Sequence, residues 1–150
     1  MRYKKILVDV ETPLEQQLRK LKITKWINLS KITHLRKIPR KNYWIYDVES
    51  GEEMLNKSPE KCLEIFKKKK RIAGNIYEAL ALYRHDPEIL KRHWIDTAGS
   101  RFGRASVPFL GLCGAGPRLR AYDAGHAHSY SGAASFGSFE PLKVETLEEI

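Results

Sequence analysis

Eight of the ten glycines in this 150-residue chain lie within residues 97–138, and this concentration constrains the fold more than any other feature. Glycine weakens helices and is common in turns and where two backbones approach closely. The same segment shows almost no helical spacing of apolar residues. We therefore expect strands and turns in the last third of the chain and helices in the first two-thirds, which together define the α+β class.

Helix starts are marked at three places by a capping side chain followed by proline. Thr12–Pro13, Ser58–Pro59 and Asp86–Pro87 each place an acceptor oxygen before a residue whose φ angle suits the first helical turn. Apolar spacing adds a helix over residues 76–83. A short helix is also expected over residues 30–37. The sequence therefore predicts helices throughout the first two-thirds of the chain.

Strand composition is clearest in residues 5–10 and 43–48, which are rich in β-branched and aromatic residues. Residues 106–113 and 118–123 are expected to form a hairpin around a turn at 114–117. The predicted architecture is a single domain with three or four helices on a mixed sheet and a C-terminal β-hairpin module. The residues expected in its one core are Leu14, Leu18, Leu21, Ile45, Leu63, Phe66, Leu80, Ile89, Leu90, Phe109 and Leu110.

Three segments of residues 1–150 differ in character within this single domain. A basic part covers residues 1–94, a glycine-rich β part covers 95–138, and an acidic tail covers 139–150. In the glycine-rich part, AGHAHSYSGAASFGS (124–138) is expected to be a turn and then a strand whose small residues let another backbone or a helix pack closely. The tail is expected to be loosely attached or to form a short terminal helix.

Charge is distributed unevenly along the chain. Residues 1–92 hold 22 Lys and Arg against 12 Asp and Glu, whereas residues 93–150 hold 5 against 6. A surface with this excess attracts polyanions, nucleic acid first among them, although a lysine-rich surface can also simply promote solubility. We expect binding of nucleic acid or another polyanion through the N-terminal two-thirds, mainly at phosphates and without a cofactor. The residues expected to make these contacts are Arg36, Lys37, Arg40, Lys41, Lys67, Lys68, Lys69, Lys70 and Arg71.

Tyr43 and Trp44 directly follow the first of these basic clusters. An exposed ring beside cations can stack on a base. If Trp44 is instead a core residue of its strand, which we expect, phosphate binding still requires only the lysines and arginines.

The chain has no run of about 18 apolar residues, so no membrane span is expected. Its opening, MRYKKILVDV, has an apolar run too short for a secretory signal, and we expect a cytoplasmic protein. Cys62 and Cys113 form no paired motif, and reduced thiols are expected for both.

A metal-dependent nuclease is the alternative function. Asp9 and Glu11 follow the first predicted strand, and residues two apart on a strand share a face, where both carboxylates could hold Mg²⁺. ILVDVET resembles the first acidic motif of the DnaQ-like 3′–5′ exonucleases, which implies metal-dependent phosphodiester cleavage with Asp9 and Glu11 as ligands. Asp47 would end a second acidic strand and Asp96 a third. The sequence departs from that family at Thr12–Pro13, where the family continues with glycine, and its later motifs are absent or too tightly spaced.

A zinc site is a second enzymatic possibility. His126 and His128 would lie on one face of a strand, and Asp123 and Cys113 could complete a ligand set. A serine nucleophile would use Ser100 or Ser135 with one of these histidines. The glycines and serines around them suit a turn equally well. Whether the protein is an enzyme stays open, as does a structural or protein-interaction role.

The last third also resembles a known family. The stretches HDPEIL (85–90), AGSR (98–101), VPFL (107–110) and GAASFGS (132–138) are similar to the C-terminal part of an uncharacterised bacterial domain family. This resemblance implies a shared β-rich module and names no substrate.

Overall fold

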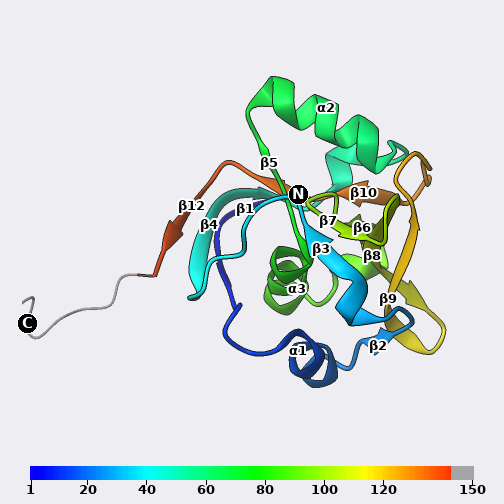
Figure 1. Ribbon diagram of the computed structural model, residues 1–150. Coiled ribbons are helices and arrows are strands. Elements are labelled where there is room, and N and C mark those ends of the chain that lie inside the picture. The colour runs from blue at the N-terminus through cyan, green and yellow to red at the C-terminus, as the bar shows by residue number, and fades with distance from the viewer. Residues whose placement is uncertain (143–150) are drawn as a thin grey trace, which may run out of the picture.

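A computed structural model describes residues 1–142, which form two β-sheets with helix α3 between them (Figure 1). The α-helices are α1 (Leu14–Lys20), α2 (Pro59–Lys69), α3 (Ile76–His85) and α4 (Ile89–Arg92). The predicted α+β class is confirmed, with the strands divided between two sheets. None of the helices in the described part of the chain is long and apolar enough to cross a membrane.

The first sheet is antiparallel and has the order β1-β4-β11-β5, with β12 also pairing with β4. Its register along β1 and β4 runs from Arg2 opposite Glu49 to Val8 opposite Tyr43. The two long strands therefore lie in opposite directions along their whole length. The strands are β1 (Arg2–Val8), β4 (Tyr43–Glu49), β5 (Ile72–Ala73), β11 (Ser135–Phe136) and β12 (Ser138–Pro141).

The second sheet is mixed and has the order β10-β6-β8-β7-β3, with β9 pairing both β8 and β2. The β8–β9 hairpin confirms the predicted one, although its turn is Gly114–Ala115 and β9 already begins at Gly116. β10 pairs with β6, and β2 with β9, in parallel. The strands are β2 (Thr24–Lys25), β3 (Ile32–His34), β6 (Trp94–Asp96), β7 (Ser100–Phe102), β8 (Ser106–Cys113), β9 (Gly116–Asp123) and β10 (Ser131–Ala133).

Helix α3 fills the space between the sheets (Figure 1). Its start is fixed by a capping box, in which Asn75 accepts the backbone N–H of Glu78 while the Glu78 side chain accepts that of Asn75. Leu80 and Leu82 are fully buried in the main core together with Ile45 and Leu110 from the two sheets. Because strands cover it on both sides, α3 is apolar over most of its circumference.

Helix α2 lies on the outside and begins as the sequence predicts. The Ser58 hydroxyl accepts the backbone N–H of Lys61 at 3.1 Å. The helix ends at Lys69, and the C-cap residue Lys70 has a left-handed φ of 56°. Beneath it, Cys62 and Phe66 pack in a second, smaller apolar cluster. The prediction that one core holds Phe66 together with the main apolar residues is therefore wrong.

The crossing from the second sheet to the first depends on glycine. Residues 131–136 belong first to β10 and then to β11. A Cβ on Gly132 would lie 2.0 Å from the carbonyl oxygen of Gly51, and Gly51 itself has a φ of +107°. No larger residue fits at Gly132 without moving backbone, so the expectation that small residues allow close packing in this stretch is confirmed.

Several local predictions are wrong. Thr12 does not cap α1, whose N-cap is Pro13 with no side-chain hydrogen bond. Residues 30–37 form no α-helix: a 3₁₀ turn over Leu29–Lys31 leads into β3, and Leu35 is 54% exposed. The first part of the expected loose tail is strand β12, while residues 143–150 lie outside the described residues.

Candidate functional site

Asp9 and Glu11 lie in the turn between β1 and α1, because β1 ends at Val8. The Asp9 carboxylate accepts the backbone N–H groups of Glu11 and Thr12, each at 3.0 Å. Burial raises the pKa of Asp9, but these hydrogen bonds outweigh it and hold that pKa below its ordinary value. Glu11 accepts the N–H of Asn42 at 3.2 Å. Both carboxylates therefore stabilise the turn, and the expected shared strand face is absent.

Asp47 lies at the opposite end of the first sheet from Asp9, since β4 runs antiparallel to β1. Its carboxylate pairs with Arg71 at 2.8 Å and with Arg2 at 3.0 Å. The hydrogen bond from Arg71 is the main reason that the pKa of Asp47 is lowered. The carboxylates expected for a metal-dependent nuclease centre are therefore not brought together.

Two of the nine predicted phosphate contacts hold the fold together. Arg36 donates to the buried Glu78 carboxylate at 2.6 Å and to the carbonyl oxygen of Ala73 at 2.9 Å. Arg71, besides its ion pair with Asp47, donates to the Ser135 hydroxyl at 2.8 Å. The charge of each of these guanidinium groups is thus opposed by a carboxylate within the fold, which reduces its attraction for an anionic ligand.

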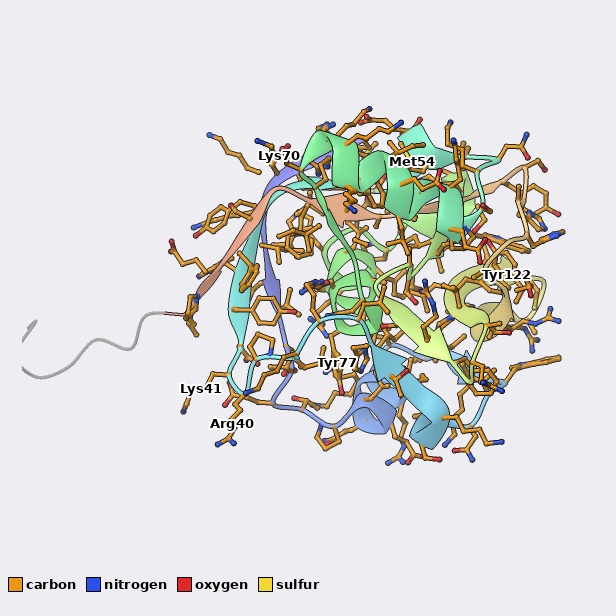
Figure 2. All side chains as sticks on the ribbon, turned by 45° about the horizontal axis from the view of Figure 1, so that its top comes forward. Arg40, Lys41, Met54, Lys70, Tyr77 and Tyr122 are labelled. Atoms are coloured by element: carbon orange, nitrogen blue, oxygen red, sulfur yellow. The ribbon has the colours of Figure 1, made fainter. Side chains whose placement is uncertain are left out.

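The other seven predicted contacts are exposed and form no ion pair within residues 1–142. They occupy two places, and Figure 2 shows Lys70 well apart from Arg40 and Lys41. The lysine patch, Lys67–Lys70, is at the end of α2, and the other group, Lys37, Arg40 and Lys41, follows β3. Trp44 is only half-buried, contrary to its expected core position, and Lys5 Nζ lies 4.4 Å from its ring centroid.

His126 and His128 join a group of aromatic rings and do not meet Cys113. Their ring centroids are 6.1 Å apart, and His128 packs against Tyr130 at 4.2 Å. Cys113 lies at the opposite end of the β8–β9 hairpin from Asp123, roughly 23 Å away at about 3.3 Å per strand residue. No group of three or more His, Cys, Asp and Glu in the described chain is placed to hold a metal ion.

Asp96 is a fully buried carboxylate beneath these rings. Its Oδ1 accepts the hydroxyls of Tyr122 and Ser131, each at 2.6 Å, whereas its Oδ2 is buried with no hydrogen-bond partner. The Nδ1 atom of His128 is also buried without a partner. Burial raises the pKa of Asp96, so this carboxyl holds its proton more tightly than usual. It can donate or accept a proton, but a substrate has no open path to it because Asp96 has no exposed surface.

The candidate serine nucleophiles are paired with other partners than His126 or His128. The Ser100 hydroxyl lies 2.9 Å from Nδ1 of His34 and accepts the N–H of Ile76 at 3.0 Å. Burial lowers the pKa of His34. Ser100 is fully buried and Ser135 is bound to Arg71, so both hydroxyls complete internal hydrogen bonds.

One exposed surface is not evident from the sequence. Trp26 is 57% exposed beside β9, and Arg118 and Arg120 approach its ring. The alternation Arg118, Arg120, Tyr122 along a predicted strand is the signal that could have shown it, because residues two apart share a face. The exposure of Trp26 depends on the pairing of β2 with β9, which is distant in sequence, so no local sequence pattern predicts it.

The fold defines an α+β protein in which two sheets enclose a central helix. Residues 15–135 match the model of DUF5701, a family of unknown function, and the chain belongs to that family. The expected relationship to an uncharacterised domain family is confirmed, and the match also covers most of the basic N-terminal part. No curated protein and no solved structure matches the chain.

Proposed function

We propose that this protein binds nucleic acid, or a polyanion of similar charge density, through the lysine patch Lys67–Lys70. The carrying observation is that these four consecutive lysines are all exposed and have no acidic partner within residues 1–142. Four adjacent cations repel one another, and an anionic ligand relieves that repulsion. The α2 helix has no packing need for them, since its buried side is made by residues such as Cys62 and Phe66.

Nearby acids are already neutralised, which supports this proposal. Asp47 binds Arg2 and Arg71, and Glu53 binds Arg2 at 3.2 Å. Lys4 and Lys5 follow Arg2 on β1, and both are exposed and without ion pairs in the described chain. The surface near the end of α2 therefore retains a positive excess after its internal ion pairs are formed.

Salt dependence tests the proposal. Fluorescence anisotropy of a labelled 20-nucleotide single strand and a 20-base-pair duplex is measured from about 50 to 300 mM KCl. Each duplex phosphate that the protein neutralises contributes about 0.9 to the slope of log affinity against log salt. Replacing Lys67–Lys70 by glutamine should lower that slope by about 2 to 4 and weaken binding to both ligands.

Two double variants, each of which removes two lysine charges, separate the effect of the lysine patch on binding from the effect of overall net charge. Lys68→Gln with Lys69→Gln removes two unpaired cations, whereas Lys61→Gln with Lys91→Gln removes two that pair with Glu64 and Glu88. The first variant should weaken binding by at least about threefold more than the second. Equal losses would contradict a local patch. Mg²⁺- or Mn²⁺-dependent cleavage that disappears in Asp9→Ala would overturn the proposal in favour of a nuclease.

A further inference from the structure

Trp26 is the most exposed large apolar side chain among those on the surface of residues 1–142, at 57%. Its backbone is nevertheless fixed: β2 pairs with β9 in parallel, and the Trp26 N–H donates to the carbonyl oxygen of Leu119 at 3.0 Å. Figure 1 shows β2 beside β9 at the edge of the second sheet. The backbone at Trp26 is thus held at a defined position while much of the side-chain surface remains open to solvent.

Two arginines lie against this ring. The guanidinium carbons of Arg118 and Arg120 are 4.5 and 5.2 Å from the Trp26 ring. Neither forms an ion pair in the described part of the chain, and the nearest polar contact of Arg118 is the Cys113 sulfur at 2.5 Å. A guanidinium that lies against a ring still has N–H groups that can donate to phosphate oxygens.

The same face of the sheet continues as a row of rings. Tyr122 follows Arg120 on that face of β9 and packs edge-on against Phe109 at 4.9 Å and against His126 at 5.5 Å. Tyr130, at the far side of this group, is 50% exposed. Figure 2 shows Tyr122 on the opposite side of the molecule from Arg40 and Lys41.

Gly111 keeps this face flat opposite Arg118. A Cβ at Gly111 would approach the Trp94 ring to 3.1 Å and the Phe109 ring to 3.2 Å. The absence of a side chain there lets the two rings stack at 5.7 Å. The surface from Trp26 towards Tyr130 therefore presents the two arginines and a group of packed aromatic rings, with no side chain at Gly111 between them.

We propose that Trp26, Arg118 and Arg120 form a stacking site for single-stranded nucleic acid. An unpaired base stacks on the open ring of Trp26, and the two guanidinium groups bind its flanking phosphates. Bases in a duplex already stack on one another and do not reach such a ring, so the site selects single strands. Two unpaired cations against the ring favour an anionic ligand over a neutral or basic protein surface. This inference rests on the proposed function and adds the class of ligand and a second contact region.

The test uses a labelled 12-nucleotide oligothymidylate and a 12-base-pair duplex at 100 mM KCl. Trp26→Ala should weaken single-strand binding about tenfold while changing duplex affinity less than about twofold. Trp26→Phe retains a ring and should lose no more than about threefold. Leu35→Ala is the matched control, because Leu35 is an exposed apolar residue of similar exposure, 54%, outside this site.

The lysine-patch variant distinguishes the two proposals. Replacing Lys67–Lys70 by glutamine should lower the affinity for both ligands, whereas Trp26→Ala should lower only the affinity for the single strand. If Trp26→Ala behaves like Leu35→Ala, the stacking site is wrong and the proposed function stands. If the unaltered protein binds neither ligand at about 50 mM KCl, both proposals are overturned and Trp26 is left as a contact for a protein partner. Thermal unfolding of each variant confirms that it is folded.

Discussion

Glu78 in α3 and Asp96 in β6 are both buried carboxylates, but their surroundings differ. Glu78 receives hydrogen bonds from the guanidinium of Arg36 and the hydroxyl of Tyr43, each at 2.6 Å, and from the backbone of Asn75. Asp96 receives only two hydroxyls, and one of its oxygens has no partner. One buried acid is thus matched by a cation and the other is not.

The difference predicts opposite contributions of the two ionised acids to the stability of the fold. A buried charge with a cation and a full set of donors has its desolvation offset, as for Glu78 at the start of α3, and removing one partner leaves the other charge uncompensated. A buried carboxyl without a cation costs stability when it ionises, and such groups are concentrated at functional sites. Asp96 also lies beneath the rings of Tyr122 and His128, beside the proposed stacking surface. Three predictions test this contrast.

Arg36→Met should give the largest effect. It leaves the Glu78 carboxylate buried without its cation, so we expect the free energy of unfolding to fall by about 3 kcal/mol. Urea unfolding followed by circular dichroism measures it. The neighbouring Lys37→Met removes the same charge from an exposed side chain and should change the free energy of unfolding by less than about 0.5 kcal/mol. Similar losses in the two variants would show that Glu78 does not depend on Arg36.

Tyr122→Phe should give an intermediate effect at neutral pH. Asp96 then keeps only the Ser131 hydroxyl as a donor, and we expect a loss of about 1 to 2 kcal/mol. Tyr46→Phe is the control, because its hydroxyl donates to Glu140 in an exposed position, and it should cost less than about 0.5 kcal/mol. If Tyr122→Phe lowers the free energy of unfolding no more than Tyr46→Phe does, the hydrogen bond from Tyr122 does not stabilise the buried carboxyl of Asp96.

Asp96→Asn should have the smallest effect and the opposite sign, a gain of about 1 kcal/mol at pH 7. Burial raises the pKa of Asp96 in the native state, so the native protein binds this proton more tightly than the unfolded chain does. The contribution of Asp96 to stability therefore falls as the pH rises from about 4 through the native pKa. The advantage of the variant should grow over the same range and be absent near pH 3.

Asp86→Asn provides the matched comparison in the same pH series. The hydrogen bond from Tyr3 is the main cause of the lowered pKa of Asp86. That carboxylate stabilises the native state above its ordinary pKa, and the contribution is lost as the pH falls. Asp86→Asn should therefore lower the free energy of unfolding at pH 7. If Asp96→Asn also lowers it, the two acids do not differ in the way we predict.

Local signals in the sequence were sufficient for some elements. Ser58 before Pro59 predicted the start of α2, since both act within one helical turn. The β8–β9 hairpin was predicted because its turn and its strands are contiguous in the chain. Residues two apart share a face only within a strand, and Asp9 and Glu11 lie beyond the end of β1. The Asp9 carboxylate accepts the backbone N–H groups of Glu11 and Thr12, and the chain turns at this point.

The candidate site depended on contacts distant in sequence, which no local pattern contains. Lys70 and Arg71 are consecutive cations, yet only Arg71 is directed by the left-handed turn at Lys70 towards Asp47 in β4. Asp96 meets Tyr122 only because β6 and β9 both pair with β8. The local charge pattern located the basic clusters, but it contains no signal for the ion pairs that Arg36 and Arg71 form with distant acids.

The strand segment that passes from β10 to β11 has a consequence for synthesis on the ribosome. The second sheet lacks its edge strand until residues 131–133 are made, and the first sheet lacks the strand between β4 and β5 until residues 135–136 follow. A growing chain that has completed helices α1 to α4 still has two unfinished sheets, each with open backbone donors and acceptors. One short segment then supplies the missing strand of each sheet within a few peptide bonds, so both sheets gain these strands almost simultaneously as the chain is made.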